Sequence, residues 1–220
     1  MKHPLTPNIK TEIMPVITLI LLAVISVYFY NNFPNQVPTH WNYRGEVDGY
    51  SGKAFGAFGI PVIIVVMYVM FLLFPLLDPK KDRYQQFKKT YHVFKTMIIV
   101  VMGLIYFYSG LAALGYPVSI NIAVPATIGL LFIVMGNYMS KIKSNWFIGI
   151  RTPWTLSNEE VWNKTHRVGG KIFIALGAFM IIGIFLPDKI YWQGFIVSLL
   201  ASVVGMMGYS YWIFKKINKN

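Results

Sequence analysis

The side chains whose types could act together in hydrolysis lie in one polar stretch of the chain. Ser157 supplies a hydroxyl, Glu160 a carboxylate and His166 an imidazole, and Arg167 follows them. On a helix, His166 is more than two turns from Ser157, which is too far for direct proton transfer. The sequence has no GxSxG, HExxH or glycine-rich phosphate-binding motif. We therefore predict that the protein is not an enzyme and has no catalytic residues.

Metal ions and cofactors are not expected either. The chain has no cysteine, which excludes thiol nucleophiles, cysteine zinc sites and iron–sulfur clusters. His40 has only Glu46 and Asp48 as acidic residues in its part of the chain, and one histidine with two carboxylates is a poor metal site. We predict no metal and no cofactor.

The elements that must position these residues are long apolar segments. The chain of 220 residues is 55% hydrophobic and 13% charged, whereas a soluble domain is about 25% charged. A bilayer core requires roughly 20 apolar residues in a helix. Six segments without Asp, Glu, Lys or Arg approach this length, and they are residues 13–30, 55–77, 97–116, 120–139, 172–186 and 190–214. The predicted fold is an all-α, polytopic membrane protein with six transmembrane helices.

The basic residues indicate the orientation of these spans. Of the 20 Lys and Arg residues, 17 lie in the N-terminus, in residues 78–95, in residues 140–171 and in the C-terminus, and three lie on the other side. Positive charge concentrates on the cytoplasmic side of membrane proteins, so we expect both termini in the cytoplasm. This asymmetry accounts for most of the net charge of +12. We therefore expect membrane lipids, and no nucleic acid, as direct partners.

Two long loops divide the chain into two parts. Residues 1–95 hold the first two spans and a structured extracytoplasmic loop, 31–54. Residues 96–220 hold the last four spans and a structured cytoplasmic loop, 140–171. Glycines recur every seven positions at Gly103 and Gly110, and again at Gly129 and Gly136, which places each pair on one helix face. These pairs, and Ala201 with Gly205, predict close helix packing.

The outer loop alternates aromatic and polar residues with turn signals at Gly45 and Gly49. Such a loop could bind a peptide or a cell-wall ligand. Alternatively, it is a small lid whose aromatic residues lie in the head-group layer, with Arg44 paired to Glu46 or Asp48, and the residue types alone favour the lid. The candidate ligand-binding residues are His40, Trp41, Asn42, Tyr43, Arg44, Asp48 and Tyr50.

In the inner loop, Ser157 and Glu160 have the spacing of a capping box, which predicts a helix starting near Asn158. Val161 and Thr165 recur at helical spacing and predict a short amphipathic helix that lies at the cytoplasmic surface and runs into the fifth span. The loop is then either a docking surface or an interfacial anchor. Its tryptophans, Trp146, Trp154 and Trp162, are expected at the interface. The candidate docking residues are Gly149, Arg151, Thr152, Pro153, Trp154, Thr155, Ser157, Glu160, Trp162, Thr165 and His166.

Both loops carry a family resemblance. Residues 149–157, with Glu160, Trp162 and His166, resemble the signature of the SdpI family, and residues 37–42 resemble a domain of unknown function often found N-terminal to it. The resemblance implies an immunity protein in the bacterial cytoplasmic membrane that protects the cell from a secreted peptide toxin. It also implies a possible receptor role, in which the protein holds a cytoplasmic repressor at the membrane.

Two other functional classes stay open. One is a membrane transporter or channel, but the absence of ionisable residues in the six segments argues against ion-coupled transport. The other is a membrane enzyme that acts on lipid or cell-wall intermediates, which would depend on Glu159, Glu160, His166 and Arg151.

Overall fold

The computed structural model describes residues 3–218, and six long helices dominate it. All six are long and apolar enough to cross a membrane, and each predicted apolar segment falls on one of them. Their bounds are α1 Ile9–Asn32, α2 Lys53–Leu77, α3 Lys88–Ala113, α4 Ile120–Met139, α6 Glu159–Ile182 and α7 Asp188–Ile217. The shorter elements are β1 Gln36–Trp41, β2 Val47–Gly52, the 3₁₀ helices η1 Lys81–Phe87 and η2 Gly183–Phe185, and α5 Pro153–Ser157.

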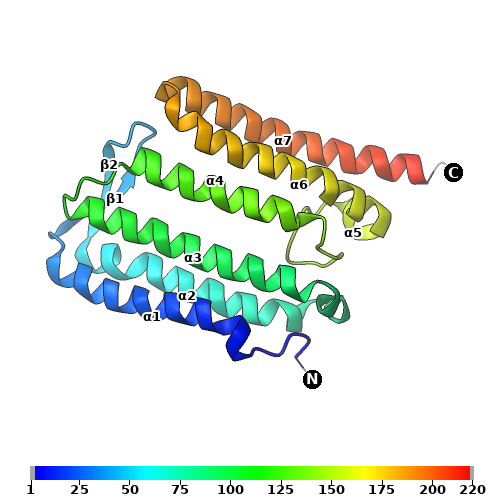
Figure 1. The fold of residues 1–220 in the computed structure, drawn as a ribbon, viewed down its shortest axis with the longest axis horizontal. Coiled ribbons are helices and arrows are strands. Elements are labelled where there is room, and N and C mark those ends of the chain that lie inside the picture. Colours follow the sequence, from blue (N-terminus) through cyan, green and yellow to red (C-terminus); the bar gives the residue numbers. More distant parts are fainter. Residues whose placement is uncertain (1–2, 219–220) are drawn as a thin grey trace.

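The helices form two groups of three that lie side by side (Figure 1). Helices α1, α2 and α3 pack on one another, α6 packs on α4 and α7, and α3 contacts α4 between the groups. Both chain ends lie at one end of the bundle, together with η1 and α5, and the two strands lie at the other (Figure 1). We call these the basic end and the hairpin end.

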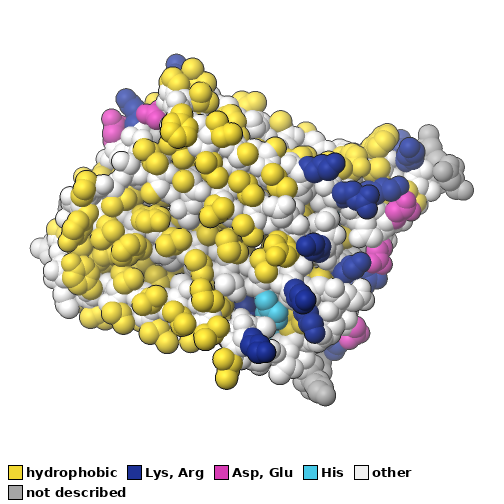
Figure 2. Space-filling model, viewed as in Figure 1, with side chains coloured by type: hydrophobic (Ala, Val, Ile, Leu, Met, Phe, Trp, Pro, Cys, Tyr) yellow, Lys and Arg dark blue, Asp and Glu magenta, His cyan; other side chains and the backbone are white. Residues whose placement is uncertain are grey.

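The surface explains the first of these names. Lys and Arg side chains gather at the end with the termini, and hydrophobic side chains cover most of the remaining visible face (Figure 2). Large apolar residues are widely exposed along the helices, as Val24 at 64% and Val204 at 70% illustrate. A soluble protein rarely exposes so much contiguous apolar surface. The distribution is that of a helix bundle whose sides face lipid.

The strands correct the all-α prediction. β1 and β2 form an antiparallel hairpin in which Val37 pairs with Ser51 and Trp41 with Val47. Val37 is only 1% exposed and packs against Gly56 of α2. The backbone hydrogen bonds between the two strands hold the hairpin together. The sequence signal was weak because Pro38 and two glycines interrupt the alternating pattern typical of strands.

The glycine faces are as predicted on α3 and α4. A Cβ atom on Gly129 would lie 2.8 Å from the carbonyl oxygen of Gly177, and one on Gly136 would lie 2.6 Å from that of Gly170. The backbones of α4 and α6 therefore meet directly. On α3, Gly110 receives the ring of Phe29. The prediction is wrong for Gly205 of α7, where a Cβ atom would meet open space.

An ion pair adjoins the apolar segments where none was predicted. Lys95 Nζ of α3 lies 2.5 Å from Glu12 Oε1 of α1, and Tyr68 of α2 donates its hydroxyl to Glu12 Oε2. Lys95 is only 1% exposed, and a charge so deeply buried requires a partner. The helices extend past the apolar segments, and this pair links all three helices of the first group at the basic end.

The charge distribution predicts which end faces the cytoplasm. Since the natural chain has no cysteine, single cysteines report accessibility without background. We expect a membrane-impermeant maleimide to label Tyr50→Cys at the hairpin end in intact cells, and to label Lys89→Cys at the basic end only after permeabilisation. Both positions are exposed. Labelling of Lys89→Cys alone in intact cells would reverse the orientation.

Candidate functional site

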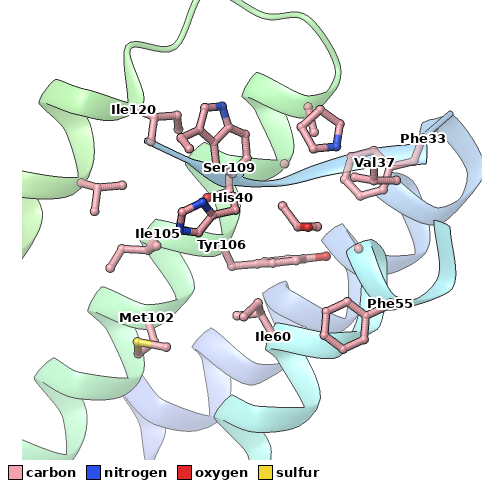
Figure 3. A pocket seen from close by; sticks show the side chains of 17 residues that line it. Phe33, Val37, His40, Phe55, Ile60, Met102, Ile105, Tyr106, Ser109 and Ile120 are labelled. Carbon is pink, nitrogen blue, oxygen red and sulfur yellow. The ribbon is translucent and has the colours of Figure 1, made fainter. Parts of the chain in front are cut away.

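A cavity of about 310 Å³ lies beneath the hairpin, and several predicted residues border it. β1 covers it from one side, and α2, α3 and α4 form its remaining walls (Figure 3). The lining is mainly apolar and includes Phe33, Val37, Phe55, Ile60, Met102 and Ile105. Thr39, His40, Tyr106 and Ser109 add polar atoms. Apolar lining with few polar groups is typical of ligand pockets.

Tyr106 forms a fixed part of the wall. Its hydroxyl donates a hydrogen bond of 2.7 Å to the carbonyl oxygen of Ala57. Its oxygen also lies 3.2 Å from Ser26 Oγ of α1. These bonds tie α1, α2 and α3 together below the cavity. The ring of Tyr106 therefore presents a preformed apolar surface.

Asn42 organises the hairpin tip. Its side-chain oxygen accepts hydrogen bonds from the backbone N–H groups of Arg44 and Glu46, at 2.8 and 3.1 Å. The backbone carbonyl oxygen of Tyr43 accepts a hydrogen bond of 2.8 Å from Trp192 Nε1 of α7. The tip therefore reaches across from the first helix group to the second.

The charged hairpin residues pair with one another. His40 Nδ1 lies 2.5 Å from Asp48 Oδ1, and Arg44 lies 3.6 Å from Glu46. Of the alternatives for Arg44, the structure thus selects Glu46. Among the predicted ligand-binding residues, His40 and Trp41 line the cavity, while Tyr50 is 61% exposed on the outer strand.

Sequence reasoning missed the helical walls of the cavity. Tyr106, Ser109, Gly110 and Ala113 come from α3 and were assigned to ordinary packing or to no role. The small residues among them lie on one helix face, and small residues opposite a loop are a signal that could have indicated a cavity.

At the basic end, residues 140–152 cross between α4 and α5 without regular structure, so side chains must satisfy their backbone. Trp146 donates its backbone N–H to Asp78 Oδ2 at 2.9 Å. Phe147 and Ile148 donate theirs to Asn145 Oδ1, at 2.9 and 2.7 Å. Asp78 is 2% exposed and Asn145 is fully buried. These two side chains therefore fix the path of the loop.

His166 has a structural position in the same loop. Its Nε2 accepts the N–H of Ile150 at 3.0 Å, and its Nδ1 donates to the carbonyl oxygen of Trp162 at 2.9 Å. The two rings stack with centroids 4.0 Å apart, and both side chains are fully buried. With both nitrogens engaged, His166 is in no position to act as an acid or base. A Cβ atom on Gly149, where φ is +114°, would lie 2.4 Å from His166 Nε2.

Three details of the inner loop differ from the predictions. Ser157 is not the cap of the long helix, because it ends α5 and donates its hydroxyl to the carbonyl oxygen of Trp154. Asn158 caps α6 instead, through Glu160 N and Val161 N. Residues 159–182 form one continuous helix and not a separate surface helix. Trp162 is buried, so its interfacial placement is wrong, although the helix start near Asn158 is confirmed.

The predicted docking residues divide into two sets. Thr152 and Thr155 form the capping box of α5, and Thr165 is fully buried. These residues, with Trp162 and His166, support the loop from inside, whereas Gly149 is exposed. Arg151, Pro153, Ser157 and Glu160 are exposed, and Trp154 is half-buried. Glu160 pairs with Lys164 at 2.7 Å.

Residues following α2 hold the loop to the first helix group. Lys80 Nζ donates to Ser144 Oγ at 2.7 Å and to the carbonyl oxygen of Leu156 at 3.1 Å. Burial lowers the pKa of Lys80, and the positive charge of Arg83 lowers it further. Arg83 in turn lies 3.0 Å from Glu159 at the start of α6.

Two family models match separate regions of the chain. The model of the SdpI/YfhL protein family matches residues 141–210, which include the inner loop and α6. This region of the chain is therefore similar to the SdpI/YfhL family. A second model, a domain of unknown function called DUF1648, matches residues 17–65, which include the hairpin.

A curated relative extends the SdpI match over nearly the whole chain. The Immunity protein SdpI of Bacillus subtilis (strain 168) is 26% identical over 210 residues, covering 95% of this chain and 98% of its own length. No solved structure matches. The SdpI/YfhL match includes the inner loop, and the DUF1648 match includes the hairpin that covers the cavity.

The cap assignment yields a paired prediction. Asn158→Ala should lower the free energy of unfolding by about 1 kcal/mol, because two N–H groups of α6 lose their acceptor. Ser157→Ala should change it by less, since Ser157 caps no helix. Thermal unfolding of the two purified variants in detergent measures this difference. A larger loss for Ser157→Ala would restore the original capping-box assignment.

The position of Gly149 yields a second prediction about stability. Gly149→Ala should destabilise the protein more than Gly115→Ala, although both glycines have positive φ, because open space surrounds only Gly115. The backbone strain costs about 1–2 kcal/mol at either position, and contact with His166 adds about 1–3 kcal/mol at Gly149. Thermal unfolding measures both. Equal losses would show that the loop moves away from His166 freely.

Proposed function

We propose that the protein is an integral membrane immunity protein that protects a bacterium from a secreted peptide toxin, and that the hairpin-covered cavity receives an apolar part of that peptide. The observation that carries the proposal is the similarity to the Immunity protein SdpI over nearly the full length of both chains. Six candidate spans and the SdpI/YfhL region support a role within the membrane.

The cavity suits such a ligand. A peptide that damages a bilayer must partition into it and so exposes apolar side chains. The cavity offers apolar walls beside the few polar atoms of Thr39, His40 and Ser109. The cavity lies at the hairpin end, opposite the basic residues. The positive-inside rule assigns the hairpin end to the outer face of the membrane. A secreted peptide reaches that face first.

The receptor role belongs to the opposite end. There, a groove is lined by four lysines, Lys88, Lys89, Lys141 and Lys143, together with Gln85. A groove of this charge would attract an acidic surface on a cytoplasmic repressor. The two roles occupy opposite faces of the membrane, so binding at one end leaves the other accessible.

Filling the cavity tests the proposal. Ser109→Phe places an aromatic ring in the space beneath the hairpin. Expressed in a sensitive Gram-positive strain that lacks its own immunity gene, the wild type should preserve survival and membrane potential when the toxin is added. We expect the variant to lower the tolerated toxin concentration by about tenfold or more, as for loss of one good apolar contact.

Leu104→Phe is the matched control, because it introduces the same aromatic ring on the same helix at a position outside the cavity lining. Leu104 is 38% exposed. It should protect like the wild type. Full protection by Ser109→Phe at equal membrane abundance would exclude the cavity as the peptide site. Killing of wild-type cells would exclude immunity to that toxin, and ion flux through the wild type in liposomes would favour a channel.

A further inference from the structure

A second cavity, of about 320 Å³, lies between α4, α6 and α7 near the basic end. Its walls are almost entirely apolar and include Phe132, Phe173, Leu176, Leu199 and Met206. Some lining residues also face outward, since Val203 is 59% exposed and Met207 is 52% exposed. The cavity therefore borders the surface that lipid would cover.

The loop residue Arg151 borders this apolar space. It lines the cavity together with its neighbours Ile150 and Thr152, and its side chain is exposed. Arg151 donates one hydrogen bond, from NH1 to the carbonyl oxygen of Trp146 at 2.7 Å. Among the described residues, no carboxylate pairs with it. A guanidinium has five N–H donors in a fixed fork, so donors remain for a phosphate group.

Further groups beside Arg151 suit a lipid head-group region. The Trp154 ring lies 5.0 Å from the ring of Tyr211 on α7, and Lys215 Nζ lies 5.5 Å from that same ring. Tyr211 follows the lining residue Met207 by about one helical turn. Tryptophan, tyrosine and lysine typically occupy the boundary between hydrocarbon and water.

We infer that this cavity binds one anionic phospholipid, with part of an acyl chain between α6 and α7 and the phosphate on Arg151. A free phosphate would use the guanidinium but not the apolar walls. A zwitterionic lipid would use the walls but carries a positive head group beside Arg151 and Lys215. Only an anionic lipid matches both the walls and the charge. The site is distinct from the hairpin-covered cavity and does not depend on the proposed immunity function.

Native mass spectrometry of the full-length protein in detergent tests this inference. The probes are dioleoyl phosphatidylglycerol, dioleoyl phosphatidylcholine with the same acyl chains, and inorganic phosphate. We expect the wild type to retain one phosphatidylglycerol in preference to phosphatidylcholine. Arg151→Gln should weaken retention by about tenfold, as expected for one charge-assisted contact. Ser202→Phe, which fills the cavity, should weaken it similarly.

Arg167→Gln is the matched control, because it removes the same charge from an exposed position on α6 outside the cavity lining. It should retain lipid like the wild type. If Ser202→Phe fails to fold, Arg151→Lys replaces it and should bind between the wild type and Arg151→Gln, since it keeps the charge but loses the fork.

Three results would each overturn the inference. Equal retention of phosphatidylcholine would show that charge does not select the lipid. Equal loss in Arg167→Gln and Arg151→Gln would show a diffuse effect of net charge. Displacement of phosphatidylglycerol by inorganic phosphate at equal concentration would show an anion site that makes no use of the cavity.

Discussion

The structure at the basic end depends on the backbone of residues 140–152. A chain that leaves its helix beside the membrane must find other partners for its N–H groups, because an unpaired polar group in an apolar setting is costly. Here Asp78, Asn145, Thr155 and His166 provide these partners as side-chain acceptors. The loop has one path because its acceptors are fixed in buried positions.

This requirement explains why a motif with the residue types of a hydrolase can be structural. Nε2 of His166 must be unprotonated to accept the backbone N–H of Ile150, and Nδ1 must carry the proton because it donates to the carbonyl oxygen of Trp162. The histidine is thus held as one neutral tautomer. Gly149 leaves room for the ring, and Trp162 covers it. A substitution at any of these positions would act by disturbing the structure of the loop and not by removing a direct contact with a ligand.

The parts of the fold that the sequence revealed are those set by local pattern. Apolar length predicted the six spans, and the spacing of Gly129 and Gly136 predicted the helix face that meets α6. The parts that it did not reveal depend on distant partners. The sequence indicated Ser157 as the cap of the long helix, and only the fold of α5 shows that Asn158 caps α6 instead. The sequence predicts Trp162 at the membrane interface, but in the structure it is buried and donates its indole N–H to the backbone carbonyl oxygen of Ile142.

The same reasoning applies to the candidate sites. His40 and Trp41 could be identified from the hairpin sequence, whereas Tyr106 and Ser109 belong to a helix that only the fold brings under β1. Arg151 was expected at a docking surface, but its place beside an apolar cavity depends on the packing of α4, α6 and α7.

The packing also limits how the two ends can communicate. The carbonyl oxygens of Gly170 and Gly177 on α6 lie where side chains at Gly136 and Gly129 of α4 would be. Because the two backbones meet so closely, α4 and α6 are held together as one unit. The two helix groups meet along α3 and α4. The hairpin tip bridges this boundary through Trp192, and Lys80 and Arg83 bridge it at the basic end. A ligand beneath the hairpin could influence the basic end by shifting one helix group against the other, since close-packed interiors transmit displacement and do not bend gradually.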